Sequence, residues 1–259
     1  MLIDSHCHLD FFDDADLPNI LANARQAGVA HMVTIGTRLA EAHRQIALAA
    51  THPQVSATIG THPHNVAEET AYTTADILAL AEHPKIIGIG ESGLDYHYDT
   101  APRETQAIAF RRHIAAARIS RLPLVIHTRA ADADTIAILT DEAGQGAFPF
   151  LLHCFSSGAA LAHAAIALGG YISLSGILTF PKSTDLRALA AELPPDRLLV
   201  ETDSPYLAPV PFRGKRCQPA YVARTAAILA EARNTTPDAI AAQTTENFRR
   251  LFTTAHPCA

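Results

Sequence analysis

Two histidines in the first stretch of the chain, MLIDSHCHLD, have a spacing that could place both on one metal ion. His6 and His8 are two positions apart and follow a short apolar run. Successive side chains of a β-strand point to opposite faces, so His6 and His8 would converge while Cys7 points away. Two converging imidazoles suit a transition metal. Such a pair is also frequent without a metal, so the metal hypothesis depends on ligands supplied by the rest of the chain.

Further residues of metal-ligand type follow other apolar runs. They are His62 in GTHPH, Glu91 in GIGESGLD, His127 in LPLVIHTR, His153 in PFLLHCF and Asp203 in LLVETDSP. A single histidine after an apolar run is usually structural. Polar capping of strands, however, would use Ser, Thr, Asn and Lys as often as His, Glu and Asp. The recurrence therefore predicts that these side chains face one common rim.

The apolar runs predict the architecture that would position these residues. Eight short apolar segments alternate with longer, Ala-rich stretches of helical character. The predicted strands begin at Leu2, Ala30, Val55, Lys85, Leu122, Phe148, Gly170 and Arg197. Near-continuous apolar strands separated by helices indicate an α/β fold with a covered parallel sheet. Eight such units indicate a TIM-type (β/α)8 barrel or a distorted relative of it.

Length and continuity favour a single domain over residues 1–259. Barrels of this type often contain about 250 residues, and no linker or repeat interrupts the sequence. The stretch from about 218 to 252 predicts additional C-terminal helices that close the barrel. A doubly wound open sheet is the alternative, but it usually has fewer strands and a Gly-rich first turn, which this sequence lacks.

Composition excludes several classes of protein. Apolar residues make up 48% of the chain, which argues against disorder. No apolar run approaches the ~18 residues of a membrane span, and no signal peptide is recognisable. The four cysteines, Cys7, Cys154, Cys217 and Cys258, show neither metal-binding nor disulfide spacing. We therefore expect a cytoplasmic protein with no membrane contact, and no stable protein partner is implied.

The candidate ligands suit two metal ions at the C-terminal ends of the strands, where such barrels place their chemistry. The six candidates are His6, His8, Glu91, His127, His153 and Asp203. Six are too many for one tetrahedral ion with an open position. Two divalent ions about 3.5–4 Å apart can hold a hydroxide and stabilise an in-line displacement at phosphorus. Mixed His and carboxylate ligands are compatible with Zn, Mn and, less readily, Mg.

The carboxylates of this set have different predicted roles. Glu91, central in chain order, is the candidate bridge between the ions. Asp203 is the candidate to bind metal and to hold or deprotonate the attacking water. Glu201 lies two residues before Asp203 and would share its strand face deeper in the barrel. We therefore predict that Glu201 orients a ligand or the water and does not coordinate directly.

Basic residues near the predicted rim are candidate phosphate ligands. Loops after the last two strands of such barrels often bind phosphate, and here that loop contains Arg213, Lys215 and Arg216. Arg129 follows His127 on the same rim. The net charge of −6 argues against wrapping a long duplex. A single strand or a strand end is favoured, with Phe180 or Tyr206 as candidate stacking surfaces.

Together these motifs resemble those of the TatD family of metal-dependent deoxyribonucleases. The matching motifs, from residue 4 to residue 216, are DSHCHLD, GTHPH, GESGLDYHYD, IHTR, HCFSSG and VETDSPYLAP followed by RGKR. The resemblance implies a TIM-type barrel with two divalent ions that hydrolyses DNA phosphodiesters, often as a 3′→5′ exonuclease. Departures from the family pattern at Cys217, Pro181 and His97 bear on substrate contacts and not on the ligands.

The resemblance also implies how the ligands are divided. One ion would be held by His6, His8, Glu91 and Asp203. The other would be held by Glu91, His127 and His153. His62 would lie on the substrate side of the rim, near the scissile phosphate, as a catalytic residue.

Two other functions compete with a deoxyribonuclease. A two-metal hydrolase of amides, esters or lactones could use the same barrel, but related enzymes often bridge their metals with a carbamylated Lys, and here a Glu ends the fourth strand. A non-catalytic metal-binding protein would be expected to lack a ligand or the acidic residue that handles water, and none is missing. We therefore predict a metal-dependent hydrolase with DNA as its substrate.

Overall fold

The computed structural model describes residues 1–254, in which eight parallel strands form one sheet in chain order, each followed by a helix. The strands are β1 (Leu2–Cys7), β2 (Val29–Ile35), β3 (Val55–Ile59), β4 (Ile86–Asp95), β5 (Leu124–Arg129), β6 (Phe150–Leu152), β7 (Tyr171–Leu174) and β8 (Leu198–Val200). This arrangement confirms the predicted TIM-type barrel. Cys258 and the end of the predicted domain lie outside the described residues.

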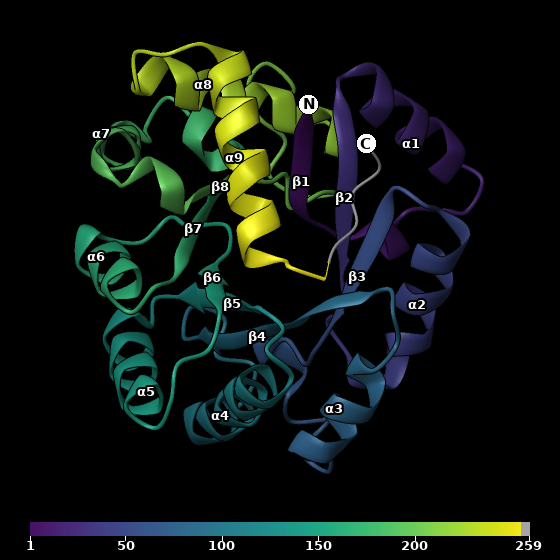
Figure 1. The fold of residues 1–259 in the computed structure, drawn as a ribbon, viewed down its shortest axis with the longest axis vertical. Coiled ribbons are helices and arrows are strands. Elements are labelled where there is room, and N and C mark those ends of the chain that lie inside the picture. The colour runs from purple at the N-terminus through teal and green to yellow at the C-terminus, as the bar shows by residue number, and fades with distance from the viewer. Residues whose placement is uncertain (255–259) are drawn as a thin grey trace.

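The helices surround the barrel (Figure 1). The α-helices are α1 (Leu17–Gln26), α2 (Ala42–Thr51), α3 (Thr74–Ala81), α4 (Arg103–Ser120), α5 (Asp132–Gly144), α6 (Ala159–Ala167), α7 (Thr184–Glu192), α8 (Val222–Ala232) and α9 (Pro237–Leu251). Six short 3-10 helices lie in the connections of the described chain. No helix within residues 1–254 is long and apolar enough to cross a membrane.

The barrel closes incompletely between β1 and β8. A single backbone bridge, Cys7 to Ser204, joins these two edges in the described chain, and it lies beyond the end of β8. The fully buried side chain of Asp4 fills this gap nearer the N-terminal ends of the strands. Its carboxylate accepts hydrogen bonds from the backbone N–H and the hydroxyl of Thr202, at 2.9 and 2.6 Å. The predicted distortion is therefore a seam that one buried side chain closes.

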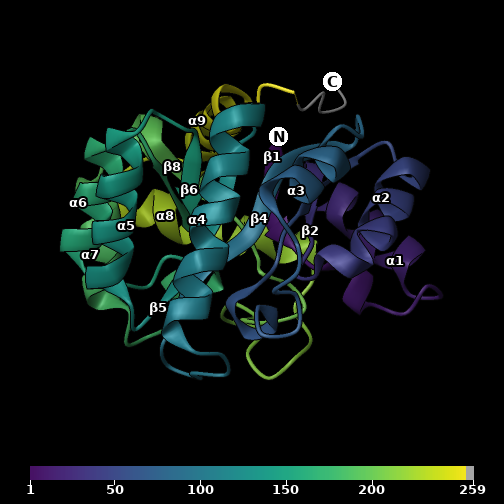
Figure 2. The same cartoon turned by 90° about the horizontal axis from the view of Figure 1, so that it is seen from below.

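The interior of the barrel is packed at the end opposite the candidate ligands. One apolar cluster joins residues of the strands to Phe248, Leu251 and Phe252 at the end of α9. Figure 2 shows α9 at one end of the barrel and the long loop after β8 at the other. Thr236 caps the start of α9 by accepting a hydrogen bond from the backbone N–H of Ala239. The predicted C-terminal helices are confirmed as α8 and α9. The end of α9 closes the barrel opposite the candidate ligands.

Some strand boundaries differ from those predicted. β4 continues past Glu91 to Asp95, whereas β6 and β8 end at Leu152 and Val200, before the polar residues that follow them. Apolar runs indicate where a buried strand lies, but backbone pairing decides where it ends. The chain leaves the sheet after Val200, so strand alternation does not orient Glu201 or Asp203.

Candidate metal centre

Glu91 lies at the centre of the polar cluster and is almost completely buried. Its Oε1 is 2.7 Å from His153 Nε2 and 3.0 Å from His127 Nδ1. Its Oε2 faces His6 and His8 and lies 3.5 Å from His6 Nε2 and 3.9 Å from His8 Nε2. The two oxygens of one carboxylate thus face two separate histidine pairs.

Asp203 and Glu201 belong to different halves of this cluster. Asp203 Oδ1 lies 3.4 Å from His6 Nε2 and 3.3 Å from His8 Nε2. Glu201 Oε1 lies 3.3 Å from His153 Nδ1 and accepts a hydrogen bond from the backbone N–H of Cys154. The Asp203 side chain is 14% exposed, whereas that of Glu201 is fully buried. Glu201 is deeper, as predicted, but the two do not share one strand face.

Three of the histidines turn one ring nitrogen toward the central carboxylates and the other toward an acceptor outside the centre. The outer nitrogen of each lies near an oxygen acceptor: His8 Nδ1 is 3.3 Å from the carbonyl of Ile35, and His153 Nδ1 is 3.3 Å from Glu201. His127 Nε2 is 3.1 Å from Asp95 Oδ2. A metal-ligating histidine usually carries its proton on the outer nitrogen and its lone pair on the inner one, and the acceptors found here would hold these rings in that tautomer.

His62 has the opposite arrangement. The backbone N–H of His64 donates to His62 Nδ1 at 3.1 Å, so the lone pair of the ring is on the outer side. The neutral ring then carries its proton on Nε2, which lies 3.4 Å from Glu91 Oε1. Burial lowers the pKa of His62 well below its usual value, which favours this neutral form. His62 is therefore suited to donate a hydrogen bond at the centre and unsuited to coordinate through Nε2.

The charges of the cluster stabilise one another. Burial alone would raise the pKa of Glu91, but the charge of His153, together with hydrogen bonds from His127 and His153, holds it well below its usual range. Burial opposes the protonation of His153, but the charges of Glu91 and Glu201 raise its pKa well above its usual value. Binding of a metal at the inner nitrogen of His153 would therefore release a proton.

The donors fit divalent metal ions by type and by spacing. Three groups have ligand atoms within 4.8 Å of one another: His6 with His8 and Asp203, His6 with His153 and Glu201, and His62 with Glu91 and His127. In the third group Glu91 and His127 are the candidate ligands, because His62 turns its N–H toward the centre. Imidazole nitrogens and carboxylate oxygens are the ligands of zinc and related ions. In the described chain, His6 Nδ1 and Glu201 Oε2 are buried without a hydrogen-bond partner. The structure thus brings all six candidate ligands together.

Asp95 is the main residue that the sequence analysis missed. Its fully buried carboxylate lies 2.8 Å from His64 Nε2 and also contacts His127. It accepts hydrogen bonds from the backbone N–H groups of His97 and Tyr98. The signal was present, because Asp95 is four residues after Glu91 on β4 and residues at even spacing share a strand face.

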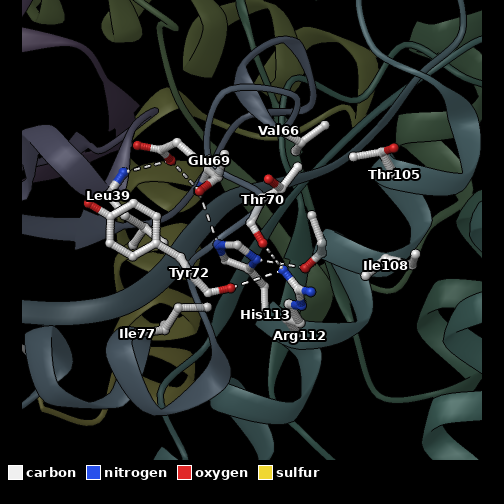
Figure 3. A pocket seen from close by; sticks show the side chains of 12 residues that line it. Leu39, Val66, Glu69, Thr70, Tyr72, Ile77, Thr105, Ile108, Arg112 and His113 are labelled. Carbon is white, nitrogen blue, oxygen red and sulfur yellow. Dashed lines mark hydrogen bonds between the residues drawn. The ribbon is translucent and has the colours of Figure 1, made fainter.

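A buried network of hydrogen bonds holds the loop that carries His62 (Figure 3). The imidazole of His113, on α4, accepts a hydrogen bond from the backbone N–H of Thr61 at 3.0 Å. Glu69 accepts hydrogen bonds from the Thr61 hydroxyl and from the backbone N–H groups of Leu39 and Ala40. Leu39, Thr61, Glu69 and His113 help to line a cavity of about 170 Å³ between this loop and α4. The network holds the residue that precedes His62.

This network predicts a pH-dependent stability. Burial lowers the pKa of His113 to about 4, whereas an unfolded chain has a His pKa of about 6.5. The unfolded state therefore binds more protons below pH 6.5, and stability is lost as the pH falls toward 4. Urea unfolding should give about 2 kcal/mol less stability from His113 at pH 5 than at pH 7.5. His113→Gln should flatten this dependence, and the exposed His163→Gln should not. An unchanged slope in His113→Gln would contradict the assignment.

The four predicted phosphate ligands lie outside the cluster. Among the described residues, none of them donates a hydrogen bond to a candidate metal ligand. The Arg129 guanidinium lies 4.8 Å from the centre of the Tyr98 ring, and that of Arg213 lies 3.8 Å from the centre of the Phe180 ring. Arg216 donates to the carbonyl of Phe11. Lys215, like Arg213 and Arg216, is exposed.

Comparisons with known proteins agree over the whole barrel. A model of TatD-related DNases matches residues 3–253. YcfH of Escherichia coli, an uncharacterized metal-dependent hydrolase, is 40% identical over 255 residues, which cover 97% of this chain and 95% of YcfH. TatD of Erwinia tasmaniensis, a 3′-5′ ssDNA/RNA exonuclease by name, is 35% identical and the match covers 92% and 93% of the two chains. The crystal structure of YjjV, a TatD homologue from E. coli, has a TM-score of 0.87 at 28% identity, covering 97% and 98%.

Proposed function

Because this chain belongs to the family of TatD-related DNases, we propose that it is a two-metal nuclease that removes nucleotides from the 3′ end of single-stranded DNA. The observation that carries the proposal is the placement of Glu91, whose two carboxylate oxygens face two different histidine pairs. A bridging carboxylate needs this arrangement. The proposal extends to one hydrolase domain over the whole chain and to a cytoplasmic location, supported by the unbonded state of Cys7, Cys154 and Cys217.

The residues present divide into two sets of ligands for divalent zinc, manganese or magnesium. His6, His8 and Asp203, with Glu91 Oε2, would hold one ion. His127 and His153, with Glu91 Oε1, would hold the other. When bound, two such ions activate water and neutralise charge on a phosphoryl group.

The protein groups around the ions have their own tasks in phosphodiester hydrolysis. Asp203 would hold the attacking water and accept its proton, because it is ionised and water can reach it. His62 would donate its Nε2 proton in a hydrogen bond to a phosphoryl oxygen. Asp95 and Glu201 would keep the rings of His127 and His153 in the orientation and tautomer that the ligands need.

The exposed arginines of the loop after β8 predict an effect on substrate binding. Replacing Arg213 and Arg216 by Gln should raise KM for single-stranded DNA about tenfold and leave kcat nearly unchanged, because phosphate contacts position the strand. Each lost contact should also reduce the dependence of log KM on log salt by about 0.7. Arg249→Gln, on α9 at the opposite end of the barrel, is the matched control. An unchanged KM would place the phosphates elsewhere.

The competing amide, ester or lactone hydrolase has less support from the site. The three lysines of the chain, Lys85, Lys182 and Lys215, are absent from the metal cluster, so the central position has a Glu in place of a carbamylated Lys. The fold alone does not discriminate between a nuclease and a carbonyl hydrolase, because TIM barrels support many types of reaction.

The test is a product analysis with both classes of substrate. Purified protein should be incubated with 5′-labelled single-stranded DNA and a panel of divalent ions, and in parallel with aryl acetates and lactones. We expect a ladder that shortens by one nucleotide from the 3′ end. Turnover of the carbonyl substrates with intact DNA would favour the competing function, and internal fragments would indicate an endonuclease.

A further inference from the structure

Exposed aromatic rings are concentrated beside the candidate metal centre. Within residues 1–254, the exposed large apolar side chains are Met1, Phe11, Tyr98, Ile108, Ile119 and Tyr206. All three aromatic members of this set lie next to the cluster. Phe11 and Tyr206 lie near His8, and Tyr98 lies near His64. Aromatic rings are costly to leave in water, so their clustering at one mouth points to a ligand.

Phe11 and Tyr206 form a continuous surface with His8. The Phe11 ring stacks on the His8 imidazole, with centroids 5.0 Å apart and planes 12° apart. Tyr206 meets Phe11 edge-to-face, with centroids 6.3 Å apart and planes 81° apart. The side chains are attached to loops after β1 and β8, at opposite sides of the barrel seam. Phe11 remains 39% exposed and Tyr206 53% exposed, so both can still accept a stacking partner.

A cationic group lies beside this surface. The Arg216 guanidinium donates a hydrogen bond to the carbonyl of Phe11 and lies 4.5 Å from the centre of the Phe12 ring. The backbone N–H of Cys217 donates to the carbonyl of Pro205, so the backbone segments that carry Arg216 and Tyr206 lie close together. Exposed aromatic rings next to an arginine match a nucleotide, which combines an aromatic base with a phosphate.

We propose that Phe11 and Tyr206 form a subsite for one unpaired nucleobase next to the His6, His8 and Asp203 half of the centre. This inference rests on the proposed nuclease function and specifies how that site selects its substrate. A base inside a duplex has both faces covered by its stacked neighbours, so the subsite would favour single strands and frayed ends. Phe180, the other candidate surface, is half-buried and has Arg213 over its ring, so it offers a poorer platform.

The test removes the nucleobase from the substrate and, separately, the aromatic ring from the protein. Single-stranded oligonucleotides with one abasic residue, placed in turn at each of the last few 3′ positions, should be cleaved by the wild type and by Tyr206→Ala. In the wild type, one position should lose about tenfold or more in kcat/KM when its base is absent, since one stacked base contributes roughly that factor. In Tyr206→Ala this penalty should fall below about threefold.

Control variants separate the effect of the Tyr206 ring from other effects of substitution, and two different outcomes would overturn the subsite and the nuclease function. Tyr206→Phe, which keeps the ring, should retain the abasic penalty, and so should Ile119→Ala on the outer face of α4. An abasic penalty that is the same in Tyr206→Ala as in the wild type would overturn the subsite. Failure of the wild type to cleave any oligonucleotide would instead overturn the proposed nuclease function.

Discussion

Asp203→Asn should lower kcat for DNA hydrolysis by roughly 10²–10⁴-fold, which is the usual contribution of a general base. Asp203 is the acidic residue of the cluster that water can reach, because its side chain is 14% exposed whereas those of Glu91, Asp95 and Glu201 are at most 3% exposed. Burial alone would raise its pKa, but the hydrogen bond from His8 and the charge of His6 lower it. It is therefore ionised at neutral pH and ready to accept a proton.

The measurement pairs single-turnover kinetics with metal analysis of the same preparation. Asn keeps an oxygen donor, so the variant should retain its metal content and its melting temperature while losing the chemical step. Asp196→Asn, at an exposed carboxylate before β8, should behave like the wild type. Glu201→Gln should show a smaller loss of about 10–100-fold, as expected for a group that acts through a ligand. Wild-type turnover by Asp203→Asn would exclude its role as a base.

Removal of metal should abolish hydrolysis and also lower the stability of the fold. The cluster collects five imidazoles and the carboxylates of Glu91, Glu201 and Asp203 around one buried point. Ions at that point would add coordination bonds to these buried donors, some of which have polar atoms without a hydrogen-bond partner. At free metal about a thousandfold above Kd, binding adds about 4 kcal/mol, which corresponds to a melting temperature about 10 °C higher for a chain of this size.

Calorimetry with and without a chelator measures this effect, and readdition of Zn, Mn or Mg should restore both activity and melting temperature. The wild type should bind two ions per chain. Glu91→Gln should bind fewer, because the neutral amide cannot bridge, and chelation should shift its melting temperature much less. Undiminished DNA cleavage in excess chelator would contradict the metal hypothesis altogether.

The sequence by itself determined the barrel and the set of candidate ligands. Eight apolar runs separated by helical stretches define parallel strands, and the C-terminal ends of parallel strands share one edge. Residues as distant as His6 and Asp203 could therefore be assigned to one rim without coordinates. The period of a strand predicts that His6 and His8 converge while Cys7 points away, and their Nε2 atoms do lie 3.3 Å apart, although His8 itself comes just after the end of β1.

Only the tertiary structure decided what each of these residues can do. The orientation of the His127 ring depends on Asp95, and the proton position on His62 depends on the backbone of His64. The exposure that separates Asp203 from Glu201 arises after the chain has left β8. The open faces of Phe11 and Tyr206 depend on two loops that meet across the seam. Alternation assigns a residue to a face, but hydrogen-bond partners and access to water depend on distances between segments far apart in the chain, and these exist only in the folded barrel.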